Sequence, residues 1–254
     1  MSQSTNQFAP ARGRALPAEG IGEDKRSGGL NWPTWCRRLA WCIILLTAPG
    51  CAWTQRVPGL AALTPAYRPQ NVFVWSSSLP PQIRRVALMP MSCDEKEPEL
   101  IEGKVALEPV LRTELAKAHR FEVIAVSPTV LRARTGQTVW ACEQALPQEM
   151  FTWLSETCGC DAILFSQLTV FRGYAPLAVG WRMRLVDLRT HSTVWATDEI
   201  FDAGLPAVRS GAYQYRFTGL QGGTGANDTW LIENSPRQFG QYAAAQLLAT
   251  LPGL

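Results

Sequence analysis

Histidine is the scarcest ionisable residue in this sequence, with only two copies, His119 and His191, among 254 residues. Enzymes with a serine or cysteine nucleophile commonly use histidine as the base, and neither histidine lies in a recognisable motif of that kind. We expect His119 to end a helix and His191 to occupy a tight hairpin turn, where polar residues are favoured by turn chemistry alone. The sequence therefore predicts a protein that is not an enzyme and has no catalytic residues.

Motifs that bind metals or phosphates are also missing. Zinc sites use cysteine pairs with two to four residues between them, whereas Cys158 and Cys160 are separated by one glycine. The glycine-rich stretch 219–228 lacks the Gly-Lys-Ser/Thr sequence of a phosphate-binding loop. The acidic stretch 94–97 follows the first predicted strand, at an edge where α/β folds place ligands, but a solvated loop is the simpler interpretation. We predict no metal site and no cofactor.

An excess of basic residues is absent from the part of the chain that is expected to fold. The whole sequence has 24 basic and 21 acidic residues, and residues 1–50 hold six and three of them, which leaves 18 of each. A nucleic-acid-binding protein normally carries a basic patch or stripe on its folded part. The balance of charge therefore argues against nucleic acid as a partner.

The sequence has no apolar run of the roughly 20 residues that a membrane-spanning helix needs. Its short apolar run follows Arg37 and Arg38 and ends in the small residues of "LLTAPGC", the three-part layout of a secretory signal. The ending resembles the lipobox of bacterial lipoproteins, with Gly50 before Cys51 and Ala48 where leucine is usual. That resemblance predicts cleavage before Cys51 and attachment of a lipid to its sulfur. An ordinary signal peptide and an uncleaved anchoring segment are the alternatives.

Three regions follow from this interpretation. Residues 1–50 would comprise a disordered extension and the signal peptide, since residues 1–30 contain few large apolar side chains. The extension could also result from a start codon placed too early. Residues 51–82, rich in proline, serine and glutamine, would form a lipid-anchored tether. Residues 83–254 would form one domain.

Four cysteines remain in the expected mature domain, Cys93, Cys142, Cys158 and Cys160. An exported protein meets an oxidising compartment, which favours one or two disulfides. Cys93 follows the first predicted strand and Cys142 lies in a later loop, so both could reach the carboxyl edge of parallel strands. We therefore expect a Cys93–Cys142 disulfide.

The order of predicted elements indicates an α/β fold. Strands and helices alternate first, which favours parallel strands joined by right-handed crossovers. Three β-rich runs then follow one another with connections so short that only antiparallel hairpins are possible. We predict strands over 83–91, 121–128, 160–171, 178–188 and 192–203, and helices over 104–120, 129–134, 147–159, 207–217 and 236–251. The prediction is a single domain with a mixed sheet and a C-terminal helix.

Three phrases carry a resemblance to a known family: "RRVALMP", "CDAILFSQLTVF" and "MRLVDLRTHSTVWA". They resemble the periplasmic α/β domain of the curli-secretion lipoprotein (CsgG) superfamily, which includes lipoprotein activators of penicillin-binding proteins and relatives of the amino-terminal domain of TolB. Asp161 with Ala162, and Asp187 with Trp195, match the family's typical phrases, whereas His191 stands where glycine is usual. The resemblance covers residues 83–251.

The resemblance implies a lipoprotein that is anchored in the outer membrane, faces the periplasm and acts in assembly, secretion or regulation through a protein partner. As the contact surface we expect the hairpin region with Tyr174, Arg182 and Arg184, because tyrosine and arginine are enriched at binding hot spots. A solvated sheet face is the alternative reading of these arginines. An alternative function is an envelope module that binds a small ligand or a glycan through exposed tryptophans.

Overall fold

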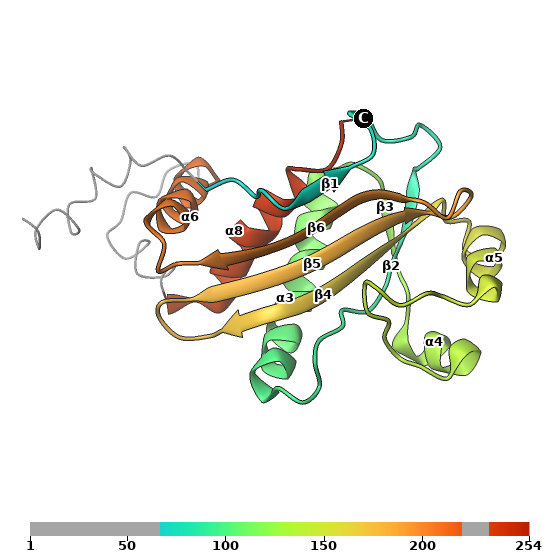
Figure 1. Ribbon diagram of the computed structural model, residues 1–254, viewed down its shortest axis with the longest axis horizontal. Helices are drawn as coiled ribbons and strands as arrows, with labels where there is room; N and C mark the ends of the chain where they lie inside the picture. The colour runs from blue at the N-terminus through green and yellow to red at the C-terminus, as the bar shows by residue number, and fades with distance from the viewer. Residues whose placement is uncertain (1–66, 220–233, 254) are drawn as a thin grey trace, which may run out of the picture. The chain divides into compact units, whose positions relative to one another are not determined.

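The computed structural model describes residues 67–219 and 234–253, which form one mixed six-stranded sheet with helices on both faces (Figure 1). The strand order is β1-β6-β5-β4-β2-β3. Expectations about the signal peptide, Cys51 and the stretch 220–228 concern residues outside the described part. Within that part, no helix is long and apolar enough to cross a membrane.

The parallel part of the sheet contains β2, β3 and the start of β4. Strand β2 (Arg85–Leu88) pairs in parallel with β3 (Glu122–Ala125) on one side and with β4 (Ala162–Arg172) on the other. Helix α3 (Pro98–Ala118) connects β2 to β3. The alternation of strand and helix in the sequence therefore gives the parallel pairing that it predicts.

The antiparallel part is a meander, as the short connections require. Strand β5 (Ala178–Asp187) pairs with β4, and β6 (Thr193–Asp202) pairs with β5. A further short strand, β1 (Val72–Val74), pairs antiparallel with β6 at the edge of the sheet. Strand β1 thus lies within residues 51–82, the stretch that we expected to form the tether.

Side chains alternate between two cores on opposite faces of the sheet. Val86 and Leu88 point to the larger core, which α3 and α8 (Pro236–Leu248) complete, whereas Ala87 and Met89 point to the smaller one. Helix α6 (Pro206–Gly219) also packs on the larger core, through Val208. Helices α3 and α8 are packed closely, because Gly240 brings the backbone of α8 against the side chain of Leu107.

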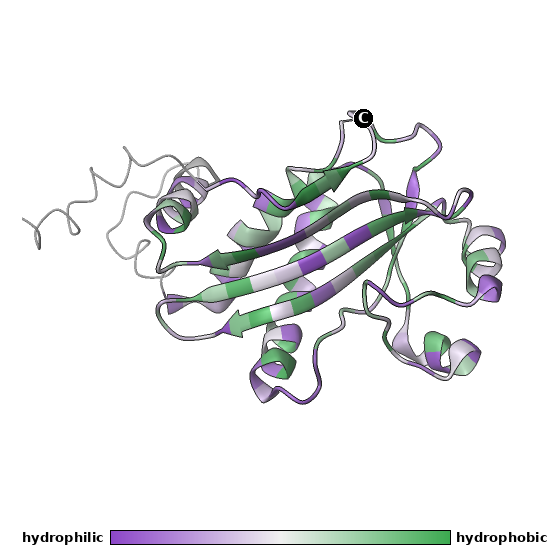
Figure 2. Ribbon diagram, viewed as in Figure 1, coloured by the Kyte–Doolittle hydropathy of each residue, from purple (hydrophilic) through white to green (hydrophobic). Residues whose placement is uncertain are grey.

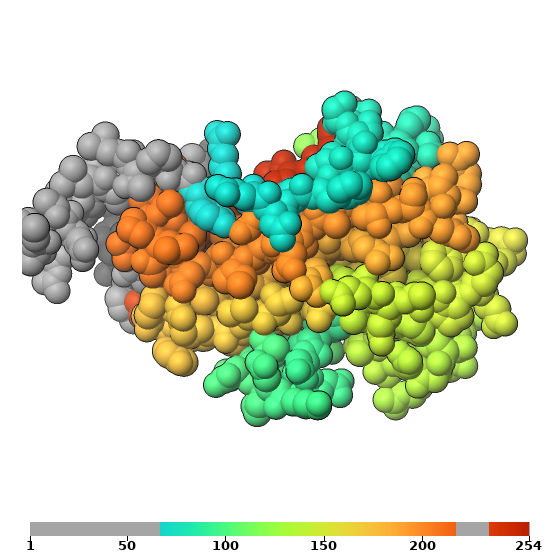
Figure 3. Space-filling view, viewed as in Figure 1, coloured from blue at the N-terminus to red at the C-terminus, as the bar shows by residue number. Residues whose placement is uncertain are grey.

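The smaller core is covered by α4 (Pro128–Thr135), α5 (Gln148–Glu156) and the segment 136–147 between them. Its strand residues come only from the part of the sheet near the carboxyl ends of β2 and β5, including Phe165 and Val186. Among the described residues, no helix lies over the remaining part of this sheet face (Figures 1 and 3).

Helix α3 differs from its expected form. It begins at Pro98, six residues before the predicted start, so Pro109 lies inside the helix and not in its first turn. Pro98 fits the first helical turn because the missing N–H has no partner there in any helix. One turn further along the helix, the hydroxyl of Thr113 donates to the carbonyl of Pro109 at 2.9 Å.

Candidate functional site

The most distinctive surface is the half of the sheet face that the segment 136–147 leaves open. We call it the uncovered sheet face and define it by Phe73, Gly180, Arg182, Asp198 and Ile200. Cross-strand pairing places these residues on one side of β1, β5 and β6. Phe73 and Ile200 are each 49% exposed, although both are large and apolar. Figure 3 shows this surface between the projecting atoms of β1 and those of the segment 136–147.

Arg182 lies at the centre of the uncovered sheet face and is held by two acidic residues. Asp198 is directly opposite on β6 and accepts from the guanidinium Nη2 at 2.7 Å and from Nε at 2.8 Å. Glu143, from the covering segment, forms a second ion pair with Nη1. The hydrogen bond to Asp198 is the main reason that the pKa of Arg182 is raised, so the side chain is a fixed cation.

The structure brings only two of the three expected contact residues together. Arg184 lies two residues from Arg182 on the same face of β5, with its guanidinium 5.8 Å from the ring centroid of Phe165. Tyr174 is 70% exposed but lies in the β4–β5 connection, beyond Ala178. Four residues of strand, or about 13 Å, separate Ala178 from Arg182. Tyr174 therefore belongs to the end of the hairpin.

The two arginines share one face because polar and apolar residues alternate along the strand. Figure 2 shows hydrophilic and hydrophobic residues alternating along β5.

The expected Cys93–Cys142 disulfide is not present, and the topology explains why. Both thiols are free; Cys93 packs against the larger core and Cys142 is buried in the smaller one. The sheet therefore separates them. Cys142 instead donates to the carbonyl of Arg182 at 3.3 Å, and burial raises its pKa to about 12. It is a buried neutral thiol that supports the strand bearing Arg182.

The two histidines occupy the local positions that the sequence predicts. His119 caps α3 with φ 48°, and His191 lies in the β5–β6 turn with φ 56°. The ring of His191 packs on Phe151, with 4.4 Å between the centroids. The left-handed backbone at His191 gives a physical reason why glycine suits this turn.

The remaining sequence candidates form no cluster. Asp94 accepts from the backbone N–H of Lys96 at 3.0 Å and is exposed, as in a solvated loop. Cys158 and Cys160 are both free. No group of three potential metal ligands occurs among the described residues.

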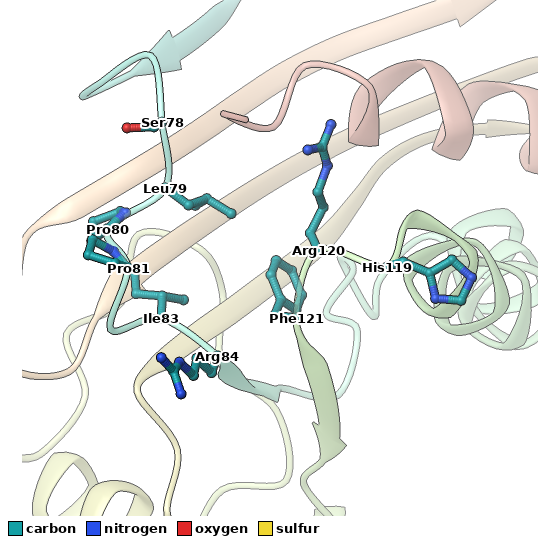
Figure 4. A pocket seen from close by; sticks show the side chains of 9 residues that line it. All are labelled: Ser78, Leu79, Pro80, Pro81, Ile83, Arg84, His119, Arg120 and Phe121. Atoms are coloured by element: carbon teal, nitrogen blue, oxygen red, sulfur yellow. The ribbon is translucent and has the colours of Figure 1, made fainter. Parts of the chain in front are cut away.

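A hollow of about 710 Å³ lies at the amino ends of β2 and β3. Arg84, His119 and Arg120 line it together with apolar residues such as Leu79 and Phe121. Figure 4 shows that these three basic side chains point in different directions, with Phe121 between the two arginines. Their charges do not converge on one point, so the hollow has no assembled polar site.

A second hollow, of about 420 Å³, lies at the opposite ends of the same strands, and we call it the switch-point pocket. Leu88 and Val126 mark the ends of β2 and β3 there, and α3 contributes Glu108 and Arg112. The chain leaves β2 toward α3 on one face and leaves β3 toward α4 on the other. Open α/β sheets bind ligands at such topological switch points.

Sequence reasoning did not identify Glu143, Asp198 or the Glu108–Arg112 pair. The Asp198 contact could have been found from the hairpin, because the short turn fixes the register of β5 and β6 to within one residue. Glu143 and the switch-point pocket depend on how separate segments come together, which no local pattern encodes.

No protein-family model matches the sequence, and no curated protein matches it. Among solved structures, the chain is similar to lipoprotein GNA1162 from Neisseria meningitidis, with 16% identity, a TM-score of 0.33 and coverage of 46% of this chain and 79% of that chain. It is similar to the LpoB C-terminal domain from Escherichia coli, with 12% identity, a TM-score of 0.31 and coverage of 59% and 97%.

A third similar structure is TolB from Acinetobacter baumannii, with 15% identity, a TM-score of 0.27 and coverage of 60% of this chain and 32% of that chain. The similar structures thus include bacterial lipoproteins and TolB. A likeness with TM-scores below 0.5 carries no argument about function, which has to come from the geometry of the chain itself.

Proposed function

We propose that the chain is a lipid-anchored envelope protein that acts without catalysis, by binding another protein through the uncovered sheet face. One observation carries the proposal: Phe73 and Ile200 remain half exposed on the same sheet face as the fixed Arg182. Neighbouring Trp75 is 70% exposed at the end of β1. Large apolar side chains around a held arginine are typical of the anchors of protein interfaces.

The charges of this face suggest what kind of surface the partner offers. Arg172 pairs with Asp202 at 2.8 Å, and Arg182 pairs with Asp198 and Glu143. Since these charges are compensated within the chain, they leave little net attraction for a charged partner. The partner should therefore present an apolar patch, and the polar groups would set register and specificity.

Exposed tryptophans, which would favour the glycan-binding alternative, are scarce in the described part of the chain. Trp181 and Trp195 are completely buried and Trp140 is 7% exposed. Trp153 is half-buried and its ring packs under the guanidinium of Arg134. Among the described tryptophans, Trp75 alone offers a widely exposed ring. Sugar-binding surfaces built on stacking normally also need a neighbouring polar groove.

The proposal is tested by photo-crosslinking in native membranes. A benzoyl-phenylalanine at position 200 should crosslink to a specific protein, and the same group at position 105 should not. Val105 is a matched control because it is 72% exposed on α3, on the other side of the sheet. Purified wild-type chain should compete for the crosslink, and Phe73→Lys should weaken it.

Stability has to be monitored in parallel, because a surface variant can also unfold the domain. Phe73→Lys should leave the melting temperature close to that of Val105→Lys while it weakens the crosslink from position 200. Equal crosslinking from positions 200 and 105, or a crosslink that Phe73→Lys leaves unchanged, would exclude the uncovered sheet face as the interface.

A further inference from the structure

The switch-point pocket contains two opposite charges on one face of α3. Glu108 and Arg112 are four residues apart, about 6 Å along the helix axis, and both line the pocket. No ion pair joins them, and within the described part of the chain the guanidinium of Arg112 has no hydrogen-bond or salt-bridge partner. The pocket therefore offers a cation and an anion at separate positions.

The Glu108 carboxylate is oriented by the segment that follows β2. Its Oε1 accepts from the backbone N–H of Met91 at 3.2 Å. The burial of Glu108 is intermediate, so its second oxygen can still be reached from the pocket. A carboxylate that is already held in place loses little side-chain entropy when it binds a ligand.

Apart from Thr113, the rest of the lining is apolar and rich in proline. Leu88, Met89 and Val126 are at most 8% exposed and line the pocket at the strand ends. Three prolines complete the wall: Pro90, Pro109 and Pro128. Because proline fixes φ, this wall has fewer backbone conformations to lose when a ligand binds. The pocket is thus largely formed before binding, as small-molecule sites usually are.

We propose that the switch-point pocket binds a small zwitterion of amino-acid size. Its carboxylate would meet Arg112, its ammonium group would meet Glu108, and its apolar body would lie against the strand ends. A simple anion would be repelled by Glu108, and a simple cation would be repelled by Arg112. The volume of about 420 Å³ lies within the range of small-ligand pockets. This site is separate from the uncovered sheet face, and the proposal does not depend on the proposed protein contact.

The test uses the full chain and thermal denaturation, first with a pool of the twenty standard amino acids and then with leucine. Two further probes each lack one charge of leucine: 4-methylpentanoate has no amine and 3-methylbutylamine has no carboxylate. Saturable stabilisation by the pool, with both one-charge probes at least about tenfold weaker than the best-binding amino acid, is the expected result.

Two variants locate the site. Arg112→Gln and Glu108→Gln should each weaken binding of the best amino acid by about tenfold or more, since each removes one charged contact. Glu108→Gln keeps an oxygen acceptor for the Met91 N–H, so folding should survive. Arg132→Gln is the matched control, because Arg132 is exposed on α4 and does not line the pocket. No stabilisation by the pool, unchanged binding in both variants, or equal binding of a one-charge probe would each overturn the proposal.

Discussion

Gly180 lies opposite an irregularity in β4, two residues before Arg182. Strand β4 contains a register shift between Leu168 and Val170, so Thr169 is an extra residue opposite β5. The bulge brings Thr169 and Val170 against Gly180, two residues before Arg182. A bulge of this kind increases local twist and directs neighbouring side chains. Gly180 is thus needed for the close approach.

Replacing Gly180 with alanine should destabilise the domain by about 1–3 kcal/mol, the usual cost of overpacking. A Cβ there would lie 2.6 Å from Thr169 Oγ1 and 3.0 Å from the backbone nitrogen of Val170, which cannot rotate away. The measurement is urea denaturation of Gly180→Ala beside Gly253→Ala. A Cβ at Gly253 would have its nearest neighbour at 3.7 Å, so this control should stay close to wild type. Equal stability of the two variants would show that the bulge can relax.

Strand β1 is only three residues long, and a cluster around Glu199 fixes the chain that leads into it. The hydroxyl of Tyr67 donates to Glu199 Oε1, and the backbone N–H groups of Gln70 and Asn71 donate to Oε2 at 2.7 and 3.1 Å. Burial acts to raise the pKa of Glu199, but these hydrogen bonds outweigh it and lower the pKa below its usual value. Burial, with the bond to Glu199, raises the pKa of Tyr67 to about 12.

The sign of these shifts predicts how attachment of β1 depends on pH. The pKa of Glu199 is lowered in the folded state. Its contribution to the stability of the folded state is therefore complete above the pKa of the unfolded chain and is lost as pH falls through the pKa of the folded protein. The Tyr67 contribution is present below pH 10 and is lost as pH rises toward 12. The segment 67–74 should therefore stay docked around neutrality and loosen first in acid.

NMR can follow the protonation of Glu199 through the chemical shift of the backbone amide of Asn71. Its shift should titrate in acid with a midpoint below the usual pKa of glutamate, and the titration should vanish in Glu199→Gln. The same variant should lose about 1–3 kcal/mol of stability, since charge-assisted hydrogen bonds become neutral ones. Asp198→Asn, which alters the adjacent carboxylate, should leave the titration in place. An Asn71 midpoint at an ordinary glutamate pKa would contradict the role of Glu199.

Comparison of the elements shows what the sequence could predict. The meander was predicted correctly because Trp181, Met183 and Leu185 alternate with Arg182 and Arg184, and this period is set by the strand itself. The same alternation correctly placed both arginines on one face. Strand β1 was missed because three residues carry no periodic signal, and their conformation comes from pairing with β6. The prediction of a Cys93–Cys142 disulfide was wrong because the sequence does not fix on which face of the sheet each connection between strands lies.

At the scale of the whole molecule, fifteen residues, 52–66, lie between Cys51 and Tyr67, the first described residue of the domain. If Cys51 carries a lipid, that stretch confines the uncovered sheet face near the membrane. Tethering through a linker of this length raises the effective concentration of a partner to about the millimolar range, so a modest interface can bind. The charge balance of residues 51–254, with 18 basic and 18 acidic residues, adds no electrostatic attraction to the membrane surface.

The anchor is tested by replacing Cys51 with alanine. Two acyl chains on one cysteine are enough for stable membrane attachment, so the variant should move from the membrane fraction to the soluble fraction and lose labelling by a palmitate analogue. Cys42→Ala, in the expected signal segment, should remain labelled and membrane-bound. The crosslink from position 200 should become weaker in Cys51→Ala, although its melting temperature stays unchanged, because only the local concentration of the partner has fallen. Persistent labelling of Cys51→Ala would disprove lipidation at this residue, and an undiminished crosslink would show that the interface binds its partner without help from the membrane.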